Sequence, residues 1–271
     1  MKTGMSTNHC DELDAEVLRE MGVHGAEWEG LHGGYFSDSA VAACLIKEIR
    51  GSAEVSNPDV VVDLAGGTGY VLRELIRLNI DPCIRLVNID VSGRQLCRTN
   101  DPRIGILNKS ISNFRRDDIC PEGACLLFVM RSALHYFGRE RLEPLLRHLR
   151  SQMRKGEIFL HQTASFAFRR DASCVNMLYE RMGTAKWFPT VREMRKLLSK
   201  EGWSITHVYR APKLLLTSQD LAVRYNLSSN TVRRISENIY RNNGDIEGVF
   251  TKLPSGFHAC LHYYIYRCVA V

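Results

Sequence analysis

V-V-V-D-L-A-G-G-T-G, residues 60–69, is the stretch of sequence that decides the fold. Its β-branched residues predict a buried strand, and the glycines that follow predict a tight turn. Residues 70–78 continue with helical spacing, so the strand feeds directly into a helix. Glycine lets the backbone approach a ligand closely because it has no Cβ atom. In this context the turn predicts a ligand site at the carboxyl end of a sheet, the alternative being a tight turn without a ligand.

Short apolar segments alternate with helical segments on both sides of this turn. We expect further strands at residues 84–89, 105–107, 126–130, 158–161, 203–209 and 262–271. The alternation favours a parallel sheet covered by helices on both faces, which is a doubly wound, Rossmann-like α/β fold. We expect residues 1–57, with helices at 11–21 and 39–49, to form a helical extension or lid. The ligand-binding domain is then expected over residues 58–271, with helical insertions at 165–190 and 213–260.

Composition narrows the class of protein. The chain has 271 residues, of which 45% are hydrophobic, and a formal net charge of +6. Lys and Arg are spread along the chain, which argues against a nucleic-acid partner and suits a small substrate. The nine Cys show no zinc-ligand spacing, so we expect no metal site. The polar N-terminus and the lack of an apolar run of about 20 residues predict a cytoplasmic protein without a membrane partner.

An acidic residue follows the glycine turn at the spacing expected of a ribose-binding carboxylate. Asp90 closes the second expected strand about 20 residues after the turn, where a carboxylate can accept hydrogen bonds from ribose hydroxyls or cap a helix. A dinucleotide usually requires a further small residue three positions after Gly69, where this chain has Leu72. Asp63 adds a negative charge before the turn. These features suit a ligand with an ammonium group and a sulfonium better than one with two phosphates.

Together these residues resemble the class I S-adenosylmethionine-dependent methyltransferases. Asp63, Ala65, Gly67 and Gly69 match the family's first motif, an acidic residue followed by G-x-G-x-G, with alanine at the first glycine. The resemblance covers roughly residues 35–210 and the last strand, and includes segments 130–137 and 187–203. It implies a seven-stranded sheet with the last strand antiparallel, and S-adenosyl-L-methionine as the cofactor. It assigns cofactor contacts to the turn and to later strand ends: Asp63, Ala65, Gly66, Gly67, Gly69, Asp90, Val91, Ser110 and Ile111.

Methyl transfer needs few catalytic residues, because the protein mainly has to align the nucleophile and exclude water. Tyr35, with Phe36 beside it, is either an aromatic lid over the sulfonium or a core contact. Arg131 either pairs with a carboxylate of the cofactor or caps a strand end. His135 is a candidate general base or a packed histidine.

The insertion after the fifth strand is where this superfamily often builds its substrate pocket. Tyr179 and Asn176 are therefore further candidates for catalytic contacts, and Trp187 and Phe188 lie in the same insertion. Helical spacing alone would equally explain Tyr179 as a core residue.

The main functional hypothesis is methyl transfer to a small molecule by a monomer or homodimer. A second keeps the cofactor and changes the reaction, as in some relatives from natural-product biosynthesis. There the amine of S-adenosylmethionine attacks its own γ-carbon and forms azetidine-2-carboxylate and methylthioadenosine. A third is DNA binding, because residues 218–236 resemble a helix-turn-helix with Arg233 and Arg234 facing a groove.

Overall fold

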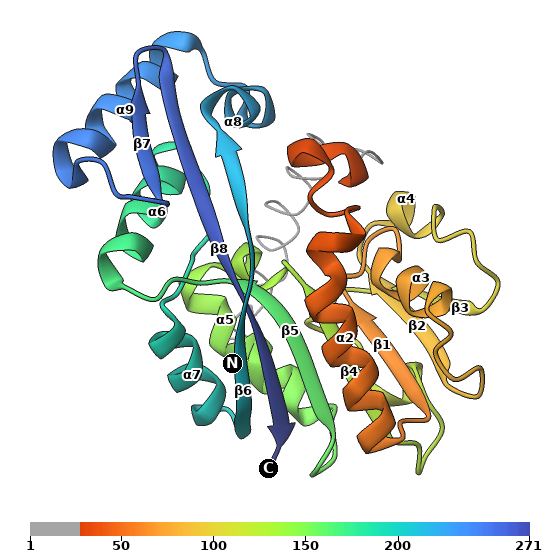
Figure 1. Ribbon diagram of the computed structural model, residues 1–271. Helices are drawn as coiled ribbons and strands as arrows, with labels where there is room; N and C mark the ends of the chain where they lie inside the picture. The colour runs from red at the N-terminus through yellow and green to blue at the C-terminus, as the bar shows by residue number, and fades with distance from the viewer. Residues whose placement is uncertain (1–27) are drawn as a thin grey trace, which may run out of the picture.

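The computed structural model describes residues 28–271, and a single mixed sheet lies at its centre (Figure 1). The strand order is β3-β2-β1-β4-β5-β8-β6, with β7 paired to β8. The strands are β1 (Val60–Leu64), β2 (Arg85–Asp90), β3 (Ile104–Asn108), β4 (Leu126–Arg131), β5 (Ile158–Ala164), β6 (Trp203–Thr217), β7 (Phe250–Leu253) and β8 (Gly256–Ala270). β1 to β5 are parallel, and β8 runs antiparallel between β5 and β6. The predicted Rossmann-like sheet is confirmed, and β7 is an addition to it.

Helices cover both faces of the sheet. α2 (Ser39–Ser56) and α3 (Tyr70–Arg77) bury apolar side chains against one face. α5 (Gly138–Ser151) and α7 (Val191–Lys200) do so on the other. α2 extends seven residues beyond its expected end at residue 49, while the expected helix at 11–21 lies outside the described residues. The remaining elements are η1 (Trp28–Gly34), α4 (Gly93–Leu96), η2 (Arg116–Asp118), η3 (Leu134–Phe137), α6 (Arg169–Arg181), α8 (Ser218–Tyr225) and α9 (Ser229–Asn243).

The last two long strands leave the sheet and carry a small second layer. β6 and β8 each span 15 residues, about twice the expected length of β6, and their outer halves pair with each other. A bulge in β6 between Ala211 and Leu214 marks the departure, at Pro212, which has no N–H to donate. The outer ribbon carries α8, α9 and β7 (Figure 1), and we call residues 213–260 the cap. The cap shares an apolar cluster with α6.

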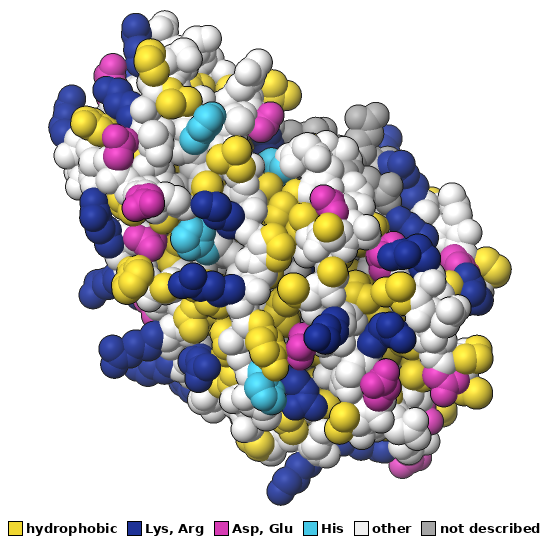
Figure 2. All heavy atoms as spheres, in the orientation of Figure 1, with side chains coloured by type: hydrophobic (Ala, Val, Ile, Leu, Met, Phe, Trp, Pro, Cys, Tyr) yellow, Lys and Arg dark blue, Asp and Glu magenta, His cyan; other side chains and the backbone are white. Residues whose placement is uncertain are grey.

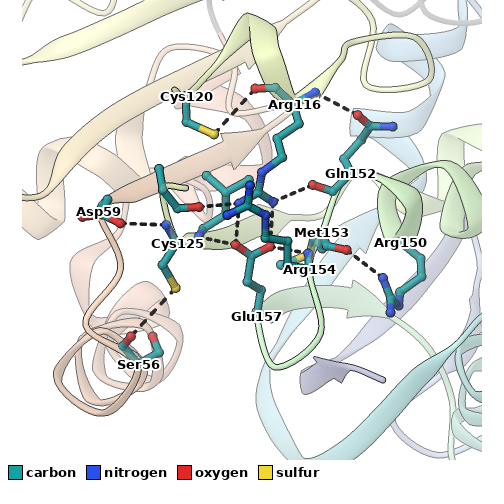
Figure 3. Close-up of polar contacts among 12 residues, drawn as sticks. Ser56, Asp59, Arg116, Cys120, Cys125, Arg150, Gln152, Met153, Arg154 and Glu157 are labelled. Carbon is teal, nitrogen blue, oxygen red and sulfur yellow. Dashed lines mark hydrogen bonds and ion pairs between the residues drawn. The ribbon is translucent and has the colours of Figure 1, made fainter. Parts of the chain in front are cut away.

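An ion pair between the half-buried Arg116 and the buried Glu157 stabilises the end of the sheet at which β4 and β5 begin (Figure 3). The Arg116 guanidinium donates to both carboxylate oxygens of Glu157, at 2.7 and 2.8 Å. Glu157 also accepts from the backbone N–H groups of Leu126 and Arg154. Arg116 further donates to the Gln152 carbonyl oxygen. One carboxylate thus joins the starts of two neighbouring strands at the edge opposite the glycine turn.

Two features are absent from residues 28–271. None of their helices combines the length and the apolar character needed to span a membrane. They also contain no group of three His, Cys, Asp or Glu side chains placed to hold a metal ion.

Candidate functional site

The strand register gathers polar side chains at the carboxyl edge of the sheet. Asp63 on β1 is the register partner of Asn88 on β2 and of Val129 on β4. Arg131, two residues after Val129, is the register partner of Gln162 on β5. Register partners in parallel strands point to the same face. Asp63, Asn88, Arg131 and Gln162 therefore form a polar row across four strands, on the face that α2 and α3 cover.

Several polar atoms of this row have no hydrogen-bond partner among the described residues. They are both carboxylate oxygens of Asp63, Asn88 Oδ1, Arg131 Nε and Gln162 Oε1, and the nearby Tyr70 hydroxyl adds another. Buried polar groups are usually paired, because leaving one unpaired costs about 1–3 kcal/mol. Such a convergence of unpaired donors and acceptors fits a ligand with both charges, such as the amino acid part of S-adenosylmethionine.

The glycine turn packs so closely against this row that side chains are excluded. A Cβ on Gly66 would lie 2.4 Å from Asn88 Oδ1 and 2.5 Å from Asp63 Oδ2. Gly67 and Gly69 have φ of 56° and 77°, which L-residues rarely adopt. Ala65, which stands at the first glycine of the motif, also has a positive φ of 55°. The turn is therefore built for close backbone approach, and it holds its alanine in a strained conformation.

Asp90 is already anchored to the turn. Its Oδ2 accepts from Gly67 N–H at 2.8 Å and its Oδ1 from Ser92 N–H at 2.7 Å. Burial raises the pKa of Asp90, while these backbone hydrogen bonds oppose the rise. A carboxylate has about four lone-pair positions, so these bonds leave acceptor capacity for a ribose hydroxyl.

The other residues assigned to the cofactor's nucleoside lie beside Asp90. Val91 is 39% exposed, and Asn108 Nδ2 donates to the carbonyl oxygens of Asp90 and Val91. Ser110 and Ile111 follow β3; Ile111 is buried and Ser110 is half-buried. The structure thus brings these residues to the ends of β2 and β3, as the sequence predicts.

Asp63 is an unusual carboxyl group. Burial and, to a smaller extent, the charge of Asp90 raise its pKa to about 8, although the charge of Arg131 opposes the rise. Burial also lowers the pKa of Arg131. The Asp63 carboxyl and the Arg131 guanidinium, both buried away from water, are suited to a zwitterionic ligand.

A short segment before α2 crosses above this row, and we call residues 30–37 the strap. Arg131 donates to the carbonyl oxygens of Phe36 and Tyr35 at 2.9 and 3.3 Å. Its guanidinium lies 5.6–5.9 Å from the ring centroids of Tyr35, Phe36 and Tyr70. The Tyr35 hydroxyl donates to the carbonyl oxygen of Pro212 at the bulge of β6. Tyr35, expected to be a lid or a core residue, is thus buried where strap, sheet and cap meet.

Three tyrosines surround a lysine at the seam between the sheet and the cap. Lys186 Nζ lies 4.6 Å from the ring centroid of Tyr136, 5.2 Å from that of Tyr225 and 5.6 Å from that of Tyr179. It donates to the Tyr225 hydroxyl at 2.6 Å. We call these three rings the tyrosine cage. Tyr179, a catalytic candidate from the sequence, is one wall of it.

His135 and Asn176 lie behind the cage. The His135 ring stacks on Phe188 at 5.3 Å and packs against Tyr136 at 4.2 Å. Asn176 donates to the Phe188 carbonyl oxygen and accepts from its N–H. Asn176 therefore holds the Phe188 backbone in place, and a direct catalytic role for Asn176 or His135 stays a prediction.

Sequence reasoning missed five residues that the structure places here: Asn88, Gln162, Lys186, Arg224 and Tyr225. Lys186 carried a signal, since it is a lone lysine directly before Trp187-Phe188. Gln162 carried no such signal, because it belongs to the site only through its register partner Arg131 on β4. Arg224 and Tyr225 were interpreted as part of a helix-turn-helix.

The segment behind that hypothesis is built into the cap. Leu221 and Tyr225 on α8 and Val232 and Ile235 on α9 are buried in the cluster that the cap shares with α6. On the face shown in Figure 2, Lys and Arg side chains are interspersed with acidic and hydrophobic ones. Neither observation supports DNA binding by residues 218–236.

Comparisons with known proteins agree with this geometry. A family model described as a methyltransferase domain matches residues 42–208. No curated protein sequence matches the chain. A protein structure from Bacillus halodurans has a TM-score of 0.63 at 13% identity, with 83% of this chain and 97% of that chain covered.

Two further solved structures contain the cofactor or its product. One is the 1,6-didemethyltoxoflavin-N1-methyltransferase of Burkholderia thailandensis with S-adenosylhomocysteine, at a TM-score of 0.55, 14% identity and coverage of 100% and 93%. The other is the magnesium protoporphyrin IX methyltransferase of Synechocystis with S-adenosylmethionine, at 0.53, 9% and full coverage of both chains. At these identities the structures show the fold alone. With the family match they confirm the resemblance predicted from the sequence.

Proposed function

Because the chain belongs to the methyltransferase-domain family, we propose that it transfers a methyl group from S-adenosylmethionine to a small molecule bound beneath the cap. Methyltransferases of this family use S-adenosylmethionine, so the cofactor predicted from the sequence is confirmed. The observation that carries the proposal is the row of buried polar atoms without a hydrogen-bond partner in residues 28–271, beside a glycine turn that has no space for side chains.

Different residues of the chain bind different parts of the cofactor. Asp63 receives the ammonium group, and Arg131 stands beside it for the carboxylate. Asp90 receives the ribose hydroxyls, and Val91, Ser110 and Ile111 flank the adenine. The turn residues Ala65, Gly66, Gly67 and Gly69 supply close backbone. Tyr35 closes the site from the strap and keeps water from the sulfonium, whose positive charge activates the methyl carbon.

The acceptor side is formed by η3, α6 and α8. His135, Tyr136 and Tyr179 lie where an acceptor would reach the methyl group from the cap side. In-line displacement needs the nucleophile held on the axis of the breaking bond, and packed aromatic rings can hold a flat acceptor rigidly. His135 is the candidate to accept the proton that the acceptor loses.

The proposal is tested by calorimetric titration with S-adenosylhomocysteine. We expect Gly66→Ala to weaken binding about 100-fold, because its Cβ would collide with Asn88 and Asp63. Gly51→Ala is the matched control, since a Cβ there meets no atom within 4 Å. Equal affinities of the two variants would overturn the assigned site.

A product assay separates the reactions. Incubation with S-adenosylmethionine and candidate acceptors should release S-adenosylhomocysteine and a methylated acceptor. Methylthioadenosine formed from S-adenosylmethionine alone would instead show that the cofactor's amine attacks its own carbon chain, and methyl transfer would be the wrong reaction.

A further inference from the structure

The solvent-facing side of α2 carries few large side chains. Its exposed positions follow helical spacing, and six of them lie on one face: Ala40, Ala43, Cys44, Lys47, Gly51 and Glu54. An exposed helix face normally presents mainly polar and charged side chains. Small side chains instead let a second helix approach closely, because the distance between two packed helices depends on the side chains between them.

A groove of about 820 Å³ runs along this face of α2. α3 borders it on one side, and the inner halves of β6 and β8 border it on the other (Figure 1). Val55, at the end of α2, is 79% exposed, and Tyr209 of β6 is 38% exposed. The Tyr209 ring also stacks on the exposed His207 ring, with 5.6 Å between their centroids. The groove therefore offers apolar surface that residues 28–271 leave in contact with solvent.

The two charged side chains at the centre of this face have the spacing that a second copy of the chain requires. Lys47 and Glu54 are two helical turns apart, about 10.5 Å along the helix axis. In the described part of the chain, neither side chain has a hydrogen bond or an ion pair with another residue. When two α2 helices cross antiparallel about a two-fold axis between Arg50 and Gly51, each Lys47 faces Glu54 of the other copy. Gly51 then lies at the point of closest approach.

We propose that this face of α2 binds a second copy of the chain as a two-fold symmetric dimer, with the two helices antiparallel. A two-fold interface is self-complementary, because a residue i that contacts residue j of the second copy is matched by j contacting i. Lys47, Glu54 and Gly51 meet this condition, since the opposite charges pair twice and the glycines leave room at the axis. The exposed face points away from the residues that α2 buries against the sheet, so the inference does not depend on the proposed function.

The experiment is sedimentation velocity of the full chain over a range of protein concentrations at low salt. The wild type should change from monomer to dimer as its concentration rises, and added salt should weaken the dimer because it screens exposed charges. Gly51→Leu should weaken dimerisation at least about tenfold, because the added side chain separates the two helices. The monomer should tolerate this change, since a Cβ on Gly51 meets no atom within 4 Å and leucine favours a helix more than glycine does. A wild type that stays monomeric at every concentration would overturn the inference.

Ser199→Leu is the matched control for that variant. It adds the same side chain at an exposed position of α7, on the other face of the sheet. It should dimerise like the wild type, and thermal unfolding should show that both variants are folded. A loss of dimer in the control as large as that in Gly51→Leu would contradict the assignment to α2.

Charge reversal tests the pairing itself. Lys47→Glu and Glu54→Lys should each weaken the dimer about tenfold, because each brings like charges together at both contacts. The double variant Lys47→Glu/Glu54→Lys should recover the affinity of the wild type. A mixture of the two single variants should form a heterodimer, since one variant carries two acidic and the other two basic side chains at these positions.

Lys196→Glu, at an exposed position of α7, is the matched control for charge reversal and should leave the dimer unchanged. A dimer that neither Lys47→Glu nor Glu54→Lys weakens would be formed by another surface, and the proposed interface would be wrong. Failure of the double variant to recover the dimer would likewise refute the antiparallel pairing.

Discussion

Asp63 illustrates how a carboxyl group at the end of a strand acquires its properties from its neighbours. Its register partner Asn88 and the closely packed Gly66 leave no room for water on one side. The nearby charges of Asp90 and Arg131 act on its pKa in opposite directions. With a pKa of about 8, Asp63 is largely protonated at neutral pH in the free protein. A ligand that brings an ammonium group must therefore displace a proton.

The consequence is a pH-dependent affinity. Between pH 6 and 8 we expect S-adenosylhomocysteine to bind more tightly as pH rises, by up to about tenfold per unit, because binding favours the ionised Asp63. Above about pH 8 this contribution should level off. Titration calorimetry in two buffers of different ionisation enthalpy would detect the released proton. Asp63→Asn should remove the slope.

Asp101→Asn serves as the control for that measurement. Hydrogen bonds from Arg103 lower the pKa of the half-buried Asp101 to about 2, so it is ionised throughout the range. An affinity that does not vary with pH in the wild type would contradict the role given to Asp63.

Site residues can be identified from the sequence only where a local sequence pattern marks them. Asp63, the glycines and Asp90 are identifiable because a turn and a strand end have local patterns. Asn88, Gln162 and Lys186 are not, because each acquires its role from a partner on another strand or helix. Tyr35 is intermediate, because its aromatic ring can be recognised in the sequence but the hydrogen bond from its hydroxyl to Pro212, 177 residues away, cannot.

Among the elements, the strands of the central sheet were predictable and the ribbon was not. β1 forms at the β-branched start of residues 60–69, where the sequence predicts a buried strand. All five of its residues are buried, and all except Asp63 are apolar. The sequence predicts a strand at residues 203–209 only. Pro212 lies just beyond it, and proline normally interrupts a strand. The bulge accommodates this proline, and the strand continues to Thr217.

The loops at the start of β4 and β5 depend on one ion pair, which gives a stability prediction. Arg116→Met should lower the free energy of unfolding by about 3–5 kcal/mol, because it leaves the Glu157 carboxylate buried without its main partner. The double variant Arg116→Met/Glu157→Gln should recover part of this loss. Urea denaturation of the two single variants and the double variant gives the coupling energy. A double variant no more stable than Arg116→Met would contradict the buried-charge explanation.

For the whole molecule, a histidine buried at the centre of the sheet makes the free energy of unfolding depend on pH. His161 on β5 stacks on Phe159 and Tyr266, each at 4.8 Å, and its Nδ1 lies 2.7 Å from Thr163 Oγ1. Complete burial lowers its pKa from 6.5 to about 3. The folded protein therefore keeps this imidazole neutral where the unfolded chain binds a proton.

We expect the stability that His161 contributes to be complete above pH 6.5 and to fall as pH decreases. The loss should approach about 1.4 kcal/mol per pH unit between 6.5 and 3, because only the unfolded state takes up the proton. His161→Phe should remove this component, so that its stability difference from the wild type changes sign or shrinks on acidification. Thermal unfolding between pH 4 and 7.5 would measure it, and parallel curves for both proteins would disprove it.

The position of β8 also has a consequence for biosynthesis of the chain. β8 lies between β5 and β6, so that β6 is joined to the sheet through a strand that is translated about 40 residues later. Until Ala270 has left the ribosome, β5 has an unpaired edge and β6 has no neighbouring strand. The nascent chain thus exposes two pairing edges late in translation, where chaperones bind and aggregation begins. Ribosome profiling with chaperone pull-down should find the longest engagement between the emergence of β6 and that of β8.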